Sequence, residues 1–512
     1  MKKLTLLTLI ITLVTSMMAQ SVALCEPFSN LWLQRVLVNG TPVGEDDDNF
    51  YFFIHTRNNN TIKPKTWTDQ AYIIDKNSMQ SKEITVTVSN KHFFLNALVN
   101  DNSIIALYNS LNNKGDQVIF TIADIDKASK ALTLNDNNSV TTSANSKYWP
   151  SYKSAKSPDG KMMAALVMVT GKDSRLENLF AVVVNDQGEF VWSGPVTPDF
   201  GGSSFSLGNL LVDNEGNIYM PAYTCQMSGN NISNIKFLMI KANGEGTNSF
   251  SEDVSFGTPQ NFTSKILKDG DVAIAGYFTD SKTNTATQSS GYFFYKFDNR
   301  SEAFGDLHYA NFSEDYVEKE QWARFSKILG NQQYSISADN IYEFENGNLA
   351  LCGEHRFMKE YYNSQMNSYS YEELTKNILV SILAPDGKTQ FAMIEKQQSG
   401  GSGMRPVDDW RVINISYSSF VHGNDMYFLF NDDPQNIPYP GKGVVFTPGG
   451  MSFKKKGESV LMRLTPDMEL TQRILPDPNQ FLRGVEFVDG DNFYASGIGK
   501  SKFFITKYSI SE

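Results

Sequence analysis

The sequence predicts an all-β protein, a single β-propeller of four-stranded antiparallel blades, with eight blades and seven as the alternative. Three observations predict this fold. A short turn of Gly, Asn and Asp followed by an apolar strand recurs eight times. A second hairpin follows these strands, and the last repeat lacks a fourth strand that a segment near the N-terminus can supply. Regular recurrence of such units is typical of closed propellers.

The repeated turn defines the period. Its second residue falls at positions 48, 102, 160, 216, 270, 347, 424 and 490, so successive copies are 54 to 77 residues apart. Asp159-Gly160 and Asn346-Gly347 are typical copies, and such dipeptides suit tight hairpins because the central residues take positive φ. Each interval is long enough for four strands, A to D, with the repeated turn between A and B. Seven blades remain the alternative because the first unit has a weak A strand.

A second turn separates strands C and D. Strand 178–184 turns at 186–188 into strand 190–192, and strands 237–240, 378–382 and 460–464 turn at 243–245, 385–387 and 466–467. These strands are rich in Phe, Tyr, Ile and Val, as expected of sheets buried between neighbouring blades.

The ends of the chain predict how the ring closes. Residues 503–508 form the third strand of the last unit, and the chain ends soon afterwards. Residues 31–38 provide a spare apolar strand, and their pairing with 503–508 would close the ring and cover an exposed sheet edge. A stacked solenoid would leave this strand unexplained and would need caps.

Three segments resemble those of known propellers. Residues 155–161 (AKSPDGK) resemble the blade signature of TolB-type propellers, and 212–219 (VDNEGNIY) that of NHL-type propellers. The pattern over 379–436, including 427–432 (YFLFND), resembles that of uncharacterised exported bacterial propeller proteins. The resemblance implies the fold and carries over no catalytic residue.

The N-terminus predicts export. Lys2 and Lys3 precede an apolar run over 4–14, and small residues allow cleavage after Ala19 or Ala23, which is the pattern of a signal peptide. We therefore expect a signal peptide over 1–23, a propeller over 24–512 and a location in the periplasm or at the cell surface. A lipid anchor at Cys25 is the alternative, although Leu24 stands where lipoprotein signals have a small residue. No other stretch is long enough for a transmembrane segment.

Composition excludes several classes of partner. The formal net charge is −11, so the chain lacks the basic footprint of nucleic-acid binding. Three cysteines, with no Cys/His spacing typical of zinc, predict neither a disulfide scaffold nor a metal site. No phosphate-binding or dinucleotide-binding motif is present, and no cofactor is expected.

Long insertions fall on one side of the predicted ring. The A–B and C–D connections are tight turns on one face, whereas the B–C and D–A connections share the other face. Insertions on that other face cover 313–329, which reads as an amphipathic helix, and 353–376, 397–410 and 431–457. Loops on a rigid scaffold commonly carry binding residues.

The candidate binding residues lie in three of these insertions: His355, Arg356, Tyr361, Tyr362, Tyr369, Tyr371, Arg405, Trp410, Asp432 and Tyr439. Tyrosines suit stacking on sugars or gripping a peptide, but they could equally pack the loop onto the blades. His355 could donate a proton beside the anion clamp Arg356, or be a surface-packed histidine. The acidic pairs 408–409 and 432–433 could serve acid–base chemistry.

These patterns favour a non-catalytic exported protein that binds a glycan, a peptide or an envelope partner. A glycan-cleaving enzyme that uses paired carboxylates on the same face is the first alternative. A structural component of an envelope assembly is the second.

Overall fold

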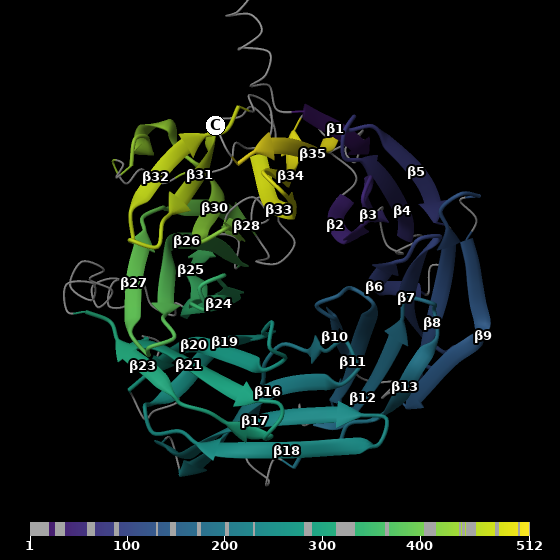
Figure 1. Ribbon diagram of the computed structural model, residues 1–512, viewed down its shortest axis with the longest axis horizontal. Coiled ribbons are helices and arrows are strands. Elements are labelled where there is room, and N and C mark those ends of the chain that lie inside the picture. Colours follow the sequence, from purple (N-terminus) through teal and green to yellow (C-terminus); the bar gives the residue numbers. More distant parts are fainter. Residues whose placement is uncertain are drawn as a thin grey trace, which may run out of the picture.

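The computed structural model describes most of the chain. The described residues are 20–25, 36–58, 67–86, 92–129, 132–143, 150–170, 176–199, 204–228, 231–280, 289–313, 333–363, 368–403, 416–439, 442, 446, 457–476, 481–499 and 502–510. They form eight antiparallel sheets arranged as blades around a ring, which confirms the eight-bladed propeller (Figure 1).

Each blade is a meander in which strand A lies innermost. Blade 1 contains β2 (Val36–Glu45), β3 (Asn49–Asn58), β4 (Trp67–Asp75) and β5 (Ser81–Val86). Blade 2 contains β6 (His92–Val99), β7 (Ser103–Leu111), β8 (Gln117–Asp126) and β9 (Leu132–Ser143). Blade 3 contains β10 (Ser151–Lys156), β11 (Met162–Thr170), β12 (Leu176–Asn185) and β13 (Phe190–Pro195). Blade 4 contains β14 (Ser204–Leu207), β15 (Leu211–Val212), β16 (Ile218–Ser228), β17 (Asn231–Asn243) and β18 (Gly246–Asp253).

The second half of the ring follows the same order. Blade 5 contains β19 (Thr258–Ile266), β20 (Val272–Thr279), β21 (Gly291–Asp298), β22 (Ala303–Phe304) and β23 (His308–Asn311). Blade 6 contains β24 (Gln333–Glu343), β25 (Leu349–Asn363), β26 (Ser368–Leu383), β27 (Thr389–Ile394) and β28 (Gln398–Gly403). Blade 7 contains β29 (Tyr417–His422), β30 (Asp425–Asp432), β31 (Glu458–Leu464) and β32 (Leu470–Ile474). Blade 8 contains β33 (Phe481–Asp489), β34 (Asn492–Gly499), β35 (Lys502–Ser509) and β1 (Gln20–Cys25).

An N-terminal strand closes the ring, but it is not the predicted one. β1 pairs antiparallel with β35, from Gln20 opposite Lys507 to Cys25 opposite Phe503. The expected pairing of 31–38 with 503–508 is wrong, because 36–38 begin β2, where Val38 lies opposite Thr56 of β3. Blade 1 needs that segment as its inner strand. The predicted boundary between signal peptide and propeller, after residue 23, falls inside β1.

The eight repeated turns all join an A strand to a B strand, as predicted. Gly160 and Gly216, for example, have φ of 71° and 87°, a left-handed conformation that glycine adopts without the steric cost of a Cβ atom. The predicted C–D turns also lie between paired strands, for example between Asn243 and Gly246. Turn chemistry therefore located the hairpins correctly.

The apolar core is divided among the seams between blades. Eight clusters of buried side chains are present in the described chain, one at each seam. At the seam of blades 8 and 1, Phe50 stacks on Phe487 and meets Tyr494 edge-on, with ring centroids 4.4 and 4.2 Å apart. Because this last seam is packed like the others, the ring is closed by side chains as well as by β1.

No helix among the described residues has the length and apolar character needed to cross a membrane. The helix expected over 313–329 lies outside the described residues, apart from Ser313.

Candidate functional site

The two faces of the ring differ in their connections. The A–B turns of all eight blades and the C–D turns of blades 1 to 7 lie at one end of the strands, which we call the turn face. The B–C and D–A connections lie at the other end, the loop-bearing face. All four long insertions belong to B–C or D–A connections, since they follow β23, β25, β28 and β30 or extend these strands. The predicted asymmetry between the faces is therefore confirmed.

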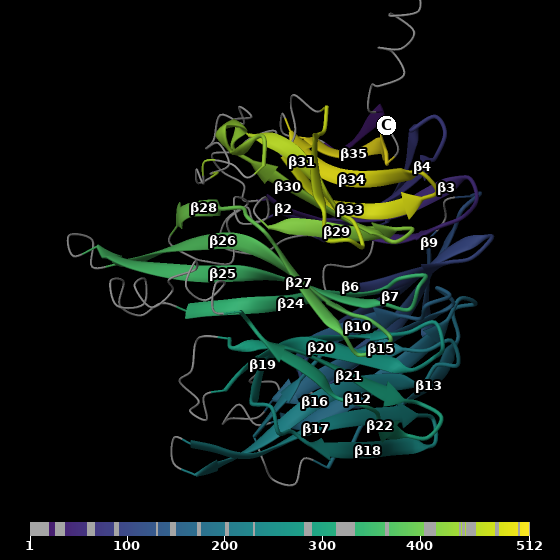
Figure 2. The same cartoon turned by 60° about the vertical axis from the view of Figure 1, so that its left-hand side comes forward.

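The insertion over 353–376 is a hairpin rather than an irregular loop. β25 and β26 remain paired from Arg356 opposite Thr375 to Asn363 opposite Ser368. β28 adds a third strand along β26. This three-stranded extension, which we call the blade-6 arm, projects beyond the neighbouring blades at the left of Figure 2. Side-chain alternation along a long hairpin, rather than loop composition, therefore decides which residues can meet a ligand.

Charged side chains are enclosed at the root of the arm. Glu354 on β25 and Lys396, which follows β27, form an ion pair with both side chains 0 % exposed. Lys396 Nζ also donates to Thr375 Oγ1 at 3.1 Å and to Gln398 Oε1 at 2.8 Å. Burial lowers the pKa of Lys396, although Glu354 favours the charged form. An enclosed pair with several further hydrogen bonds holds its members firmly in one geometry.

The other oxygen of Glu354 ties blade 6 to blade 7. Ser416 Oγ donates to Glu354 Oε2 at 2.7 Å, and the Ser416 backbone N–H donates to Gln398 Oε1 at 2.6 Å. Ser416 has φ of 99°, a conformation that costs a non-glycine residue free energy and persists only where its surroundings enforce it. The buried network therefore fixes the start of β29 as well as the arm.

One arginine links two carboxylates on neighbouring strands. Arg356 Nε lies 3.3 Å from Glu354 Oε2, and Arg356 Nη2 lies 3.6 Å from Asp339 Oδ1 on β24. Burial raises the pKa of Asp339, and Arg356 opposes that shift. Glu354 is completely enclosed and already held by Lys396, Arg356 and Ser416, so this pair of acids acts as a structural tie.

His355 points to the opposite side of β25 from Glu354 and is 0 % exposed. The interpretation of His355 as a surface-packed histidine is therefore wrong. Burial, followed by the positive charges of Lys376 and Lys396, lowers the pKa of His355 to about 3. The imidazole is neutral at physiological pH, so it does not have the charged form that a proton donor would need there.

The remaining predicted residues separate into three groups. Tyr362 lies near the arm tip and is 55 % exposed. Tyr361, Tyr369 and Tyr371 lie on the arm strands. Arg405 and Trp410, with the acidic pair 408–409, lie outside the described residues.

Asp432 and Tyr439 hold the connection that follows β30. Asp432 is 3 % exposed and accepts from Asn436 Nδ2 at 2.7 Å and from the Asp433 backbone N–H at 2.8 Å. Burial raises the pKa of Asp432. The short 3-10 helix η2 (Pro434–Asn436) follows directly. Tyr439 packs partly buried against the core of blades 6 and 7.

Sequence reasoning missed a hollow at the seam of blades 1 and 2. It has a volume of about 420 Å³ and lies at the loop-bearing end of blade 2. It is lined by His92, Ser110, Leu111, Asn112, Asn113, Ile119, Thr121 and Ser139. The available signal was Ser110 and Thr121, two polar residues at positions that alternation assigns to the core face.

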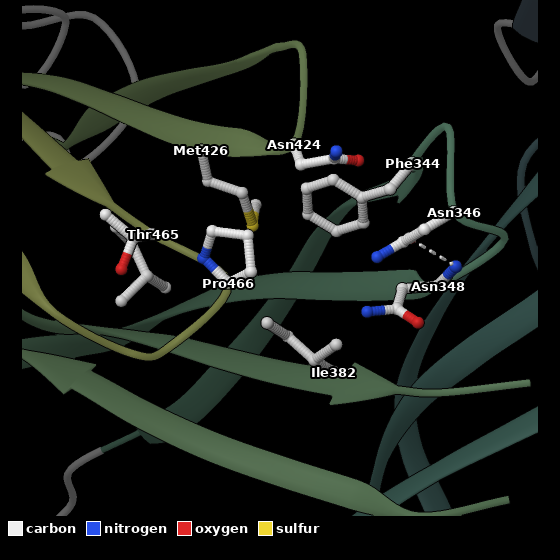
Figure 3. Close-up of a pocket in the computed structure, with 9 residues that line it drawn as sticks. Phe344, Asn346, Asn348, Ile382, Asn424, Met426, Thr465 and Pro466 are labelled. Carbon is white, nitrogen blue, oxygen red and sulfur yellow. Dashed lines mark hydrogen bonds between the residues drawn. The ribbon is translucent and has the colours of Figure 1, made fainter. Parts of the chain in front are cut away.

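A second hollow lies on the turn face between blades 6 and 7. Phe344, Met426 and Pro466 are among its lining residues (Figure 3). Its volume of about 10 Å³ leaves room for about one water molecule. It is too small to hold a ligand.

Within the described residues, no group of three or more His, Cys, Asp or Glu side chains is placed to hold a metal ion. Cys225 and Cys352 are free thiols there, and burial raises the pKa of both.

Comparisons with known proteins identify no family for this chain. No family model matches the chain, and no curated protein matches it in sequence. Among solved structures, the β-propeller domain of the Trilobed protease from Pyrococcus furiosus is similar, with 10 % identity, 83 % of this chain and 97 % of that chain covered, and a TM-score of 0.34. The polysaccharide lyase Uly1 has 11 % identity, covers 81 % of this chain and 89 % of that chain, and has a TM-score of 0.37. An α-L-arabinanase from Penicillium chrysogenum has 9 % identity, 62 % and 93 % coverage, and a TM-score of 0.31. At such identities and TM-scores these neighbours indicate nothing about what the chain binds.

Proposed function

We propose that the protein is a non-catalytic, exported binding protein that presents its loop-bearing face to a glycan, a peptide or an envelope partner, with the blade-6 arm as a main contact element. The observation that carries the proposal is a projecting hairpin rooted in an enclosed ion pair. A protruding element with a fixed root can contact a partner without a large loss of conformational entropy on binding.

The arm has the composition of a binding element. Tyr362 keeps 55 % of its surface exposed, and Tyr361, Tyr369 and Tyr371 flank it along the hairpin. Aromatic residues frequently contribute most of the binding energy at interfaces. The exposed Tyr362, on a hairpin with a fixed root, therefore supports recognition of a partner.

The test shortens the arm without disturbing its root. Lys359 and Glu372 are cross-strand neighbours, so an Asn-Gly turn can replace residues 360–371. A matched control shortens the blade-4 hairpin by the same device, replacing 227–232 between the paired residues Gln226 and Ser233. Both variants and the intact protein are screened on glycan and peptide arrays, and their melting temperatures are compared.

We expect the shortened arm to lose at least tenfold in affinity while the blade-4 control binds normally. Tyr362→Ala is expected to weaken binding by about tenfold, which corresponds to about 1.4 kcal/mol. Unchanged affinity of a folded arm-shortened variant would contradict the proposal, as would equal losses in the two shortened variants.

A further inference from the structure

The hollow between blades 1 and 2 interrupts an otherwise apolar seam. On the blade-1 side of blade 2, Ile104, Ala106 and Tyr108 of β7 and Ala123 and Ile125 of β8 belong to the core. Alternation puts Ser110 next after Tyr108, and Thr121 next before Ala123, on that same side. The apolar core therefore gives way to hydroxyl groups towards the loop-bearing face.

Two of these hydroxyl-bearing residues open onto the hollow. Thr121 is 2 % exposed and Ser110 is 7 % exposed, and both line the hollow. Neither hydroxyl forms a hydrogen bond with the described part of the chain, and neither oxygen is among its fully enclosed unpaired polar atoms. Both hydroxyls are therefore free to hydrogen-bond with a molecule that enters the hollow.

The rest of the described lining is largely polar. His92 lies opposite Ser110, and Ser110 lies opposite Ile119, so the three form one row across β6, β7 and β8. Ser139 of β9 lies opposite Thr121 in the next row. Among the described residues, the lining contains hydroxyls, amides, one imidazole and the aliphatic side chain of Ile119, with no carboxylate, lysine or arginine, whereas Leu111 packs its side chain into the seam of blades 2 and 3.

This chemistry selects a class of ligand. Neutral sugars present several hydroxyl groups together with apolar C–H faces, which match the hydroxyl and amide groups and the side chain of Ile119. The described lining has no lysine or arginine and so offers no strong counter-charge for a phosphate or a uronate. A volume of about 420 Å³ lies within the usual range of about 300–1,000 Å³ for small-molecule sites.

We propose that this hollow binds one unit of a neutral carbohydrate. The inference deepens the proposed function, on which it rests for a ligand on the loop-bearing face, and it names a site on the far side of the ring from the arm (Figure 1). The sugar hydroxyls would pair with Ser110 and Thr121, which explains why these polar residues stand at core positions.

The test removes the hydroxyls and, separately, blocks the hollow. Thr121→Val combined with Ser110→Ala removes both hydroxyls with little change of shape. Ser139→Trp fills the hollow from its exposed rim. Ser251→Trp is the matched control, because Ser251 is an exposed residue on β18, the corresponding outer strand of blade 4. Binding of neutral hexose, pentose and N-acetylhexosamine oligosaccharides, with uronate-containing oligosaccharides for comparison, is measured by calorimetry.

We expect neutral saccharides to bind the intact protein and the Ser251→Trp control equally. Ser139→Trp is expected to abolish binding, and the double variant to weaken it at least tenfold. The melting temperature of the double variant should be nearly unchanged, because neither hydroxyl forms a hydrogen bond with the described part of the chain. A lower melting temperature would show that the hydroxyls are structural and would overturn the proposal.

The arm-shortened variant separates the two proposals. Neutral saccharide binding that survives arm shortening but not Ser139→Trp supports the hollow as the sugar site. Saccharide binding that survives Ser139→Trp but not arm shortening overturns the hollow and leaves the arm in place. Failure of every neutral saccharide to bind, or a preference for uronates, also overturns the hollow, whatever the arm binds.

Discussion

At the scale of residues, the enclosed pair of Glu354 and Lys396 makes the sharpest prediction about stability. Lys396→Met removes the enclosed counter-charge of the buried Glu354 carboxylate and leaves only the half-exposed Arg356 beside it, and we expect a loss of about 3 kcal/mol in the free energy of unfolding. Lys388→Met is the control, because Lys388 pairs with Asp386 at the surface, with 82 % and 54 % of the side chains exposed. The control should unfold almost like the wild type. Urea denaturation measures both, and equal losses would contradict the prediction.

His355 makes a prediction about pH. Its pKa is about 3 in the folded protein, against an ordinary value of 6.5 for histidine, so below pH 6.5 the unfolded chain binds a proton that the folded chain does not. The contribution of the neutral His355 to the free energy of unfolding is therefore complete above pH 6.5. It decreases as pH falls towards 3, by up to about 1.4 kcal/mol per pH unit. We expect His355→Gln to have a shallower stability profile than the wild type between pH 6.5 and 5, as measured by denaturation at each pH. Stability profiles of equal slope for His355→Gln and the wild type would contradict this prediction.

Residue types identified candidate binding groups in the chain, but not which way their side chains point. His355 and Arg356 are adjacent, yet one is fully enclosed and the other half-exposed, because alternation along β25 sends neighbours to opposite sides. An interpretation of 353–376 as a loop does not use the alternation of side chains along a strand. Ser110 and Thr121 were passed over for the opposite reason, since they stand within strongly apolar strands and attract notice only once strand faces are assigned.

At the scale of elements, the turns were predictable and the closing strand was not. Each repeated turn has a local chemical requirement that its own residues reveal. Two N-terminal segments, 20–25 and 36–45, could each pair with the last blade. Contacts between residues far apart in the chain decide which of them does so. Pro42, Gly40 and Gly44 make β2 a poor strand by local propensity, so residues 31–38 were assigned as the spare strand.

Removing β1 tests its part in closing the ring. Deletion of 20–25 leaves β35 with an unpaired edge. We expect faster deuterium exchange in β35 and a lower melting temperature, whereas deletion of 2–19 should change neither. Equal protection of β35 in the two deletion variants would contradict the assignment of β1.

At the scale of the whole molecule, ring closure constrains where a signal peptide would be cleaved under the proposed export. Cleavage after Ala19 would keep β1 complete, whereas cleavage after Ala23 or lipidation of Cys25 would remove most of its pairing with β35. We therefore expect the mature exported protein to begin at Gln20. Mass spectrometry of the N-terminal peptide measures this, and a mature chain beginning at Leu24 or at an acylated Cys25 would contradict it.

The pairing of β1 with β35 also sets the order of events during biosynthesis. β1, the first strand of the described chain, has β35 as its partner, about 480 residues later in the chain. Contacts between such distant segments form late, because a long loop must be closed before they stabilise anything. The blades can assemble one after another as they emerge from the ribosome, but the circle is completed only after β35 has emerged. Before that pairing forms, β1 has an exposed, unpaired edge. A chaperone bound during this interval would protect the chain from aggregation.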